Sequence, residues 1–337
     1  MIALKDEKVL DLGYQLPTEQ FQPDVALQHI VLAEQAGFDS IWVSDHFLPW
    51  FHTDAAGSFA WALIASAAQA TKRVKLGTGV TCPILRYHPA IVAQAFATLE
   101  YMHSNRIFVS LGTGEALNEV PLGYKWPAYK ERVERLVESI EIMRKLWTGE
   151  VINHQGKYWR LNRARLYTPR RHRIPIYVAA SGPTVAKVAG QVADGFLTVP
   201  ASEEKYRNVI FPALEEGLKD SNRSMDQISK SIVISMTYDA NDPVKALQAA
   251  RPWAGSIMPE RIRMVRPQRP ASSGSCVTST SVAPRRAGES NKRSMIARPV
   301  VSSRFPVGSS AINSDGRGES ARASATRCCS PPESCAG

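Results

Sequence analysis

The chain has 337 residues, of which 44% are hydrophobic, enough for one large α/β barrel or two ordinary domains. Its net charge of +10 is concentrated at one end. Residues 261–337 hold 13 Lys and Arg against 4 Asp and Glu, which leaves 28 positive and 27 negative residues in the first 260. A nearly neutral globular part argues against nucleic-acid binding. Because no run of about eighteen apolar residues occurs, we expect neither a transmembrane helix nor a membrane partner.

The N-terminal residues lack the basic-then-apolar order of a secretory signal, so a cytoplasmic protein is expected. Of the five Cys residues, only Cys82 precedes residue 260. The others, at positions 276, 328, 329 and 335, lack the spacing of zinc ligands. Neither a metal site nor a disulfide framework is therefore expected.

Strand-like and helix-like segments alternate from residue 9 to residue 253. Apolar, β-branched segments predict strands at 9–15, 40–43, 74–80, 106–111, 176–180, 195–199 and 231–238. Amphipathic segments predict helices at 23–36, 60–71, 89–102, 129–147, 183–193, 203–220 and 243–253. A hairpin is predicted at 149–161, around Gln155-Gly156. Such steady alternation favours a parallel sheet, and seven βα units approach the eight of a closed barrel. We predict an α/β fold, a (β/α)8 TIM barrel over residues 1–258 that is incomplete at its eighth βα unit.

Residues 259–337 have a different composition from the rest of the chain. Residues 261–337 contain 16 Ser and neither Trp nor Tyr, while Arg, Pro, Ala and Gly are frequent. Such a segment buries too little apolar surface to offset its chain entropy, so we predict a disordered basic tail. It is either a native extension or GC-rich coding DNA read out of frame. We favour the shifted frame, because the predicted barrel ends before its eighth strand.

Polar and aromatic residues follow the predicted strand 40–43. Residues 43–50 read Val-Ser-Asp-His-Phe-Leu-Pro-Trp. Ligands of parallel α/β folds bind beyond the carboxyl ends of the strands. There, Asp45 beside His46 forms a charge-tuned proton carrier, and Trp50 offers a flat wall to a planar ligand. The alternative is a strand-terminal His held by a turn Asp, with Trp50 as ordinary packing.

Three segments rich in glycine and small residues follow later strands, at 76–83, 111–119 and 179–183. Glycine permits close approach of the backbone to a ligand, and Ala180-Ser181-Gly182 before a helix favours an anion such as phosphate. Small residues also serve tight turns, so each segment alone is weak. Gly112-Thr113-Gly114 is not a dinucleotide fingerprint, because Leu117 stands where the third Gly is required.

Together, these segments resemble the luciferase-like superfamily. The residues that carry the likeness are 44–50, 82–90, 93–97 and 112–119. Within the superfamily they resemble the branch that uses the deazaflavin coenzyme F420. That branch contains glucose-6-phosphate, secondary alcohol and hydroxymycolic acid dehydrogenases. The resemblance covers residues 10–258 and does not extend into the tail.

The resemblance implies an oxidoreductase, usually a homodimer, that binds F420 at the carboxyl mouth of a luciferase-like barrel. It implies hydride transfer from a carbinol carbon to C5 of the coenzyme. The catalytic residues that it implies are His46, Glu115, Trp50 and Glu19. The implied cofactor-binding residues are Asp45, Gly79, Val80, Asn118, Ala180, Ser181 and Gly182, with a non-prolyl cis peptide bond between Gly79 and Val80. Glu115 as a helix N-terminal carboxylate, and Glu19 as a solvated loop charge, remain alternatives.

The substrate expected from this sequence is a small uncharged alcohol. Relatives that use sugar phosphates place a Lys in the segment that corresponds to 199–204, and none stands there. A phosphate dianion needs such a cation to offset its desolvation, so glucose 6-phosphate is disfavoured. Three other functions stay open: an FMN-dependent monooxygenase, nucleic-acid binding through the basic tail, and an inactive frameshifted product. The motif Glu115-Ala116-Leu117-Asn118 favours F420 over FMN.

Overall fold

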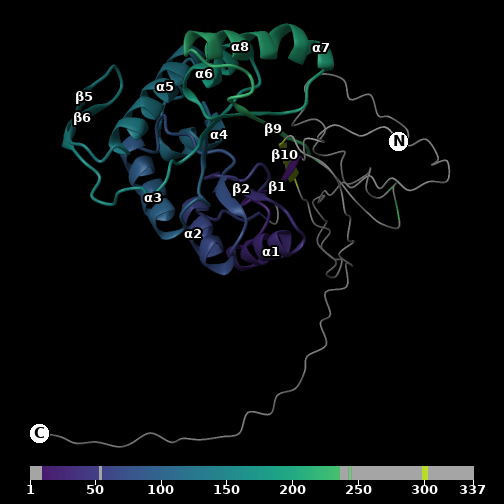
Figure 1. Ribbon diagram of the computed structural model, residues 1–337. Coiled ribbons are helices and arrows are strands. Elements are labelled where there is room, and N and C mark those ends of the chain that lie inside the picture. The colour runs from purple at the N-terminus through teal and green to yellow at the C-terminus, as the bar shows by residue number, and fades with distance from the viewer. Residues whose placement is uncertain (1–9, 53–54, 236–241, 243, 245–297, 303–337) are drawn as a thin grey trace, which may run out of the picture.

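Strands and helices alternate through the described part of this computed structural model, which comprises residues 10–52, 55–235, 242, 244 and 298–302 (Figure 1). The strands of the main sheet are β1 (Asp11–Leu16), β2 (Ser40–Val43), β3 (Lys75–Thr78), β4 (Val109–Leu111), β7 (Ile176–Ala179), β8 (Gly195–Thr198), β9 (Ser229–Val233) and β10 (Arg298–Ser302). The helices are α1 (Pro23–Gln35), α2 (Ala60–Ala70), α3 (Pro89–Met102), α4 (Ala116–Glu119), α5 (Tyr129–Leu146), α6 (Pro183–Val192), α7 (Glu203–Lys205) and α8 (Phe211–Asp220). A 3-10 turn spans Val120–Leu122, and a π-helical turn spans Tyr206–Ile210.

The main sheet has the strand order β3-β2-β1-β10-β9-β8-β7-β4. Neighbouring strands other than β10 pair in parallel. Its two outer strands meet through isolated parallel bridges, Leu76 with Ile107 and Thr81 with Leu111, and not through a continuous ladder. The sheet therefore curls into the shape of a barrel, with the helices as an outer layer (Figure 1).

No eighth βα unit with a parallel strand occurs in the described residues, as the sequence predicts. The position between β9 and β1 is taken instead by β10, which is antiparallel to both. This strand lies within the predicted tail, so these five residues have regular structure in a segment where the sequence predicts none. The rest of the predicted tail lies outside the described residues. So does the predicted helix at 243–253, apart from Val244.

Two predicted elements differ from the structure in detail. The predicted helix 203–220 is divided by the π-helical turn before Pro212, whose missing N–H cannot continue the regular hydrogen-bond ladder. The hairpin predicted at 149–161 lies a few residues later in the chain, as β5 (Ile152–Gln155) and β6 (Arg160–Ala164). It projects from the rim of the barrel (Figure 1).

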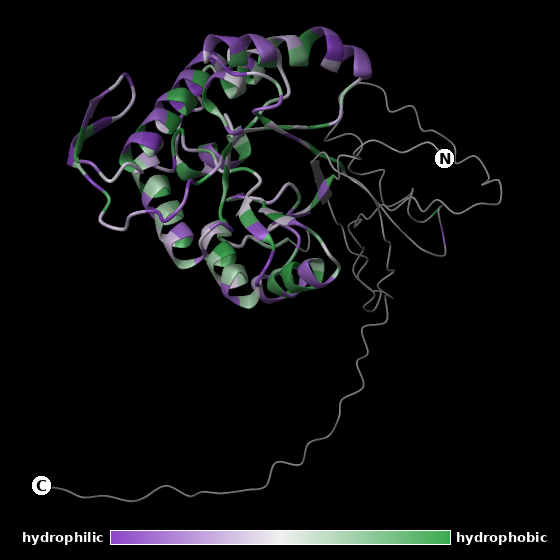
Figure 2. Ribbon diagram, viewed as in Figure 1, coloured by the Kyte–Doolittle hydropathy of each residue, from purple (hydrophilic) through white to green (hydrophobic). Residues whose placement is uncertain are grey.

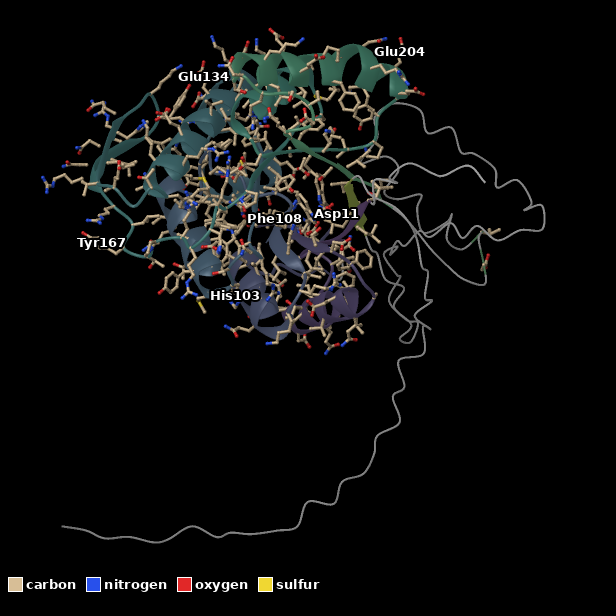
Figure 3. All side chains as sticks on the ribbon, in the orientation of Figure 1. Asp11, His103, Phe108, Glu134, Tyr167 and Glu204 are labelled. Carbon is tan, nitrogen blue, oxygen red and sulfur yellow. The ribbon has the colours of Figure 1, made fainter. Side chains whose placement is uncertain are left out.

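The barrel interior is filled by an aromatic cluster. The ring centroid of Trp42 lies 4.4 Å from that of Phe108 and 4.9 Å from that of Tyr177. Figure 3 shows Phe108 among the strands, while Tyr167 lies at the outer edge. A Cβ atom at Gly77 or Gly195 would overlap the rings of Phe108 and Tyr177, so these glycines make room for the cluster. The interior of the barrel is thus packed with side chains, and ligands of such barrels bind at the carboxyl ends of the strands.

A second apolar layer lies between the strands and the helices. The fully buried residues Ile41, Leu76, Phe96 and Ile140 belong to it. The hydropathy colours of Figure 2 follow this layering, with hydrophobic residues toward the strands and hydrophilic ones on the outer helix faces. No helix of the described residues is long and apolar enough to cross a membrane.

Candidate functional site at the carboxyl mouth

Three loops converge at the carboxyl ends of β2, β3 and β4. They carry residues 44–50, 79–88 and 112–119, the segments that the sequence singles out. Although these loops are far apart in the chain, hydrogen bonds join them to one another. The mouth of the barrel therefore brings the predicted site segments together.

Asp45 is a buried carboxylate with donors on both oxygens. Its side chain accepts hydrogen bonds from the Thr81 hydroxyl at 2.6 Å and from the Tyr87 hydroxyl at 2.9 Å. Burial and the nearby Asp45 charge raise the pKa of Tyr87, so this phenol stays protonated as a donor. Asp45 is only 3% exposed. Its carboxylate is held in one orientation by the loop after β3.

Arg86 lies between Asp45 and a second buried carboxylate, Glu119. Its Nη2 is 3.3 Å from Oδ1 of Asp45, and its Nε is 3.3 Å from Oε1 of Glu119. The backbone N–H of Arg86 donates to Oε2 of Glu119 at 3.0 Å. Burial raises the pKa of Glu119, while Arg86 works in the opposite direction. One guanidinium therefore links the loops after β2, β3 and β4.

His46 faces Glu115 and Trp50. Its Nε2 lies 3.8 Å from Oε2 of Glu115, and its ring centroid lies 5.5 Å from that of Trp50. Within the described part of the chain, its buried Nδ1 has no hydrogen-bond partner. The side chain of Glu115 is 45% exposed, and Trp50 is 38% exposed. His46 therefore directs Nε2 at a half-exposed carboxylate, while its Nδ1 is turned away from solvent.

Asn118 fixes the loop that carries His46. Its Oδ1 accepts hydrogen bonds from the backbone N–H groups of Phe47 at 2.8 Å and Leu48 at 3.3 Å. Its Nδ2 donates to Oε2 of Glu115 at 3.5 Å. The visible role of Asn118 is therefore to position two catalytic candidates. Its contact with a cofactor stays a prediction.

Glu19 is 5% exposed and follows β1. It accepts a hydrogen bond from the Ser44 hydroxyl at 2.6 Å and one from the Thr18 hydroxyl at 3.4 Å. The alternative interpretation as a solvated loop charge is therefore wrong. Glu19 lies against the residue that precedes Asp45, and its catalytic role stays a prediction.

The peptide bond between Gly79 and Val80 is cis, as predicted. The Gly79 carbonyl accepts a hydrogen bond from Nε2 of Gln15 at 3.0 Å. The loop after β4 packs closely on this segment, because a Cβ at Gly112 would lie 2.9 Å from Cγ2 of Val80. Gly114, at φ +74°, lies against Cys82, where a Cβ would overlap the sulfur. Both glycines allow the loop that carries Glu115 to lie on the loop after β3.

Ala180, Ser181 and Gly182 connect β7 with α6. Ala180 is buried, Ser181 is exposed, and Gly182 is the N-cap of α6 without a side-chain capping bond. Because β7 pairs with β4, this turn lies next to the loop after β4, which carries Glu115. No acidic residue occurs between Gly182 and Val192, so the helix N-terminus remains favourable for an anion.

Four residues of the site were not predicted from the sequence: Thr81, Arg86, Tyr87 and Glu119. Arg86, Tyr87 and Glu119 lie inside the segments that carry the family resemblance, and Thr81 directly precedes one of them. A charged residue in an otherwise apolar segment, such as Arg86 after Ile84-Leu85, was the available signal.

Comparisons with known proteins agree with this geometry. The family model for luciferase-like monooxygenases matches residues 10–298. An F420-dependent glucose-6-phosphate dehydrogenase of Mycolicibacterium fortuitum is 44% identical over 256 residues, which cover 75% of this chain and 76% of the relative. One of Intrasporangium calvum is 46% identical over 250 residues, which cover 73% and 75%.

Two solved structures of F420-dependent proteins are similar to the chain in fold and sequence. An F420-dependent secondary alcohol dehydrogenase in complex with an F420-acetone adduct has a TM-score of 0.71 at 41% identity, covering 76% of each chain. The coenzyme F420-dependent tetrahydromethanopterin reductase of Methanopyrus kandleri has a TM-score of 0.65 at 25% identity, covering 75% of this chain and 72% of its own. The family model and these likenesses lead to one assignment: the chain belongs to the luciferase-like monooxygenase family.

Proposed function

We propose that the chain is an F420-dependent oxidoreductase that transfers hydride from the carbinol carbon of a small secondary alcohol to the coenzyme. The observation that carries the proposal is the pairing of His46 with Glu115 beside Trp50 at the barrel mouth. Relatives at 41–46% identity that are named for F420 support the coenzyme.

The residues of the mouth fit such a coenzyme. The segment Gly79-Val80 is closely packed, because Gly112 lies against Val80 and Gly79 lies against Trp42. Nothing would lie within 4 Å of a Cβ at Gly182, so the turn before α6 is open to a phosphate. Asp45, Gly79, Val80 and Asn118 would hold the ring, and Ala180, Ser181 and Gly182 the phosphate. When bound, the coenzyme supplies an electrophilic ring carbon that accepts hydride.

His46 would take the hydroxyl proton as the carbonyl forms. Its Nδ1 is buried, whereas its Nε2 lies 3.8 Å from Oε2 of the half-exposed Glu115. Nε2 would accept the hydroxyl proton and pass it to Glu115. Glu115 would then hold the proton that the reduced coenzyme requires. Trp50 would exclude water from the reacting carbon, and Glu19 would orient the loop through Ser44.

The described residues favour an uncharged substrate. At the mouth, the guanidinium of Arg86 is already engaged by two carboxylates and its side chain is 7% exposed. After β8, Arg207 pairs with Glu203 at 2.7 Å. Arg86 could bind a substrate phosphate only by leaving a buried carboxylate, whereas the Arg207 pair is exposed and contributes little. A neutral alcohol avoids that cost.

The test compares coenzymes and substrates on the full chain. The protein is titrated with oxidised F420 and with FMN, and bound absorbance is recorded. Coenzyme reduction is then followed with isopropanol and with glucose 6-phosphate. We expect F420 to bind and isopropanol to reduce it. Binding of FMN with oxygen consumption would instead indicate a monooxygenase, and reduction by glucose 6-phosphate alone would overturn the proposed substrate.

We further propose that the enzyme is a homodimer in the cytoplasm. Light scattering of the purified full chain at several concentrations tests the first point, and cell fractionation tests the second. A stable monomer, or recovery outside the cytoplasmic fraction, would contradict them.

A further inference from the structure

Arg86 makes a contact that its two ion pairs do not explain. Its guanidinium also donates to the backbone carbonyl of Asp45. That carbonyl belongs to the peptide unit that joins Asp45 to His46. Arg86 therefore binds the backbone carbonyl directly before His46 as well as the Asp45 carboxylate.

The His46 ring itself has weak side-chain anchors. Its distance of 3.8 Å from Glu115 exceeds a normal hydrogen bond, and its contact with Trp50 is a tilted ring contact at 5.5 Å. The backbone on the other side of His46 is held by Asn118, through the N–H groups of Phe47 and Leu48. The direction of the ring thus depends on backbone anchors before and after it.

Arg86 is suited to be the first of these anchors. Its side chain is 7% exposed, and its planar fork reaches Asp45 and Glu119 at the same time. Glu119, fully buried, holds both the guanidinium and the backbone N–H of Arg86. Because two carboxylates lie beside this one cation, its position is fixed from both sides.

We propose that Arg86 is a positioning residue for His46, acting through the Asp45 carbonyl while Glu119 holds Arg86 in place. The effect of Arg86 on turnover rests on the proposed function. The effect of Arg86 on the position of the His46 ring applies to the protein without coenzyme as well. A misplaced ring would lose proton transfer more than substrate binding, since orientation errors of about 1 Å cost on the order of 100-fold in rate.

The kinetic test uses Arg86→Ala, Arg86→Lys and the matched control Arg135→Ala. Arg135 also donates to a backbone carbonyl of this segment, that of Ile84 at 3.3 Å, but lies outside the site. We expect Arg86→Ala to lower kcat about 100-fold, with a smaller change in KM and a displaced pH profile. Guanidinium ion added to Arg86→Ala should restore part of kcat, and Arg86→Lys should lie between it and the wild type. Equal losses in Arg135→Ala, or no rescue, would overturn the proposal.

A second test needs no turnover. Full-length protein with 15N-labelled His is titrated by NMR, and the His46 signals are identified by their loss in His46→Gln. Arg86→Ala should shift or broaden these signals and change their titration midpoint, while Arg135→Ala should leave them unchanged. Unchanged His46 signals in folded Arg86→Ala would contradict the positioning role. Shifted signals in a protein that does not reduce F420 would sustain it and reject the proposed function.

Discussion

Carboxylates at the two ends of the barrel are satisfied by different kinds of donor. At the amino end, Glu34 accepts the backbone N–H groups of Lys72, Arg73 and Val74, and Glu100 accepts those of Arg171 and His172. At the mouth, the donors come mainly from side chains, as in the contacts of Asp45 and Glu119 with Arg86.

The difference separates folding from function. A carboxylate that accepts backbone N–H groups fixes the path of the chain, and it can do little else, because those donors cannot leave without unfolding the turn. A carboxylate held by side chains can orient a ligand or a neighbouring histidine. We therefore expect substitutions at the amino end to change stability and substitutions at the mouth to change turnover.

The largest effect should follow His46→Ala. Removal of the proton acceptor should lower kcat by about 100- to 10,000-fold, the range for general acid–base catalysis, while the Kd for F420 stays within a few-fold. Steady-state rates and coenzyme titration measure the two quantities. His52→Ala is the control, since His52 is exposed on the same loop. Near-normal turnover in His46→Ala would remove the functional contrast between the two ends.

Glu100→Ala should produce the opposite pattern. It removes the acceptor of two backbone N–H groups and of the His172 ring, where Glu100 itself is fully buried. Hydrogen bonds to a charged group contribute about 1.5–3 kcal/mol each, so a loss of about 3 kcal/mol in the free energy of unfolding is expected. Denaturant unfolding measures it. Turnover per folded molecule should be unchanged, and a kinetic defect at full folding would break the comparison.

Gly114→Ala should weaken both stability and turnover, because it acts on the loop that carries Glu115. The added Cβ meets Cys82 at a backbone φ of +74°. Gly123→Ala is a matched control, with φ +88° and nothing within 4 Å of the added atom. The steric cost at Gly114 alone should make its loss of stability larger by about 1–3 kcal/mol, measured by urea unfolding. Equal losses would mean that the two loops can separate freely.

The smallest effects should be opposite pH dependences at the two ends. Burial raises the pKa of Glu34, but the N–H groups of Val74, Arg73 and Lys72 outweigh it and the folded pKa is lowered. Its stabilisation is present above the unfolded value of about 4.3 and is lost as pH falls through the folded pKa. The folded pKa of Glu119 is raised, mainly by burial, so its contribution to stability falls as pH rises from about 4.3 toward that pKa.

Glu34→Gln and Glu119→Gln separate these contributions. The free energy of unfolding is measured from pH 3 upward. Compared with the wild type, Glu34→Gln should lose the part of the stability that decreases as pH falls, which is less than about 1 kcal/mol at this partly exposed site. Glu119→Gln should lose the part of the stability that decreases as pH rises. Slopes of the same sign would contradict the difference between the two ends.

Local sequence patterns predicted the strands and part of the site, and the family resemblance implied most of the other site residues. Residues 40–43 are apolar and followed by polar residues, so both strand β2 and the position of His46 at its end could be inferred. The family resemblance implied Glu115 as a second catalytic residue, and the structure places its carboxylate beside His46. The roles of Arg86 and Glu119 did not follow, because their burial depends on how three loops meet. Strand β10 could not be foreseen, since its segment has the composition of a disordered chain.

The shifted reading frame of residues 259–337 stays a prediction. Strand β10 shows that residues 298–302 pair with β1 and β9 in the structure. Sequencing of the coding DNA around codon 260 tests the frame directly. An intact frame would make the segment a native extension.

Deuterium transfer tests the central claim most directly. The full chain is mixed with oxidised F420 and isopropanol deuterated at its carbinol carbon, and the reduced coenzyme is analysed by mass spectrometry. The proposed hydride transfer predicts one deuterium on the coenzyme, formed by the wild type and not by His46→Ala with F420 still bound. Bound F420 that remains oxidised, or reduced coenzyme that carries no deuterium, would contradict it.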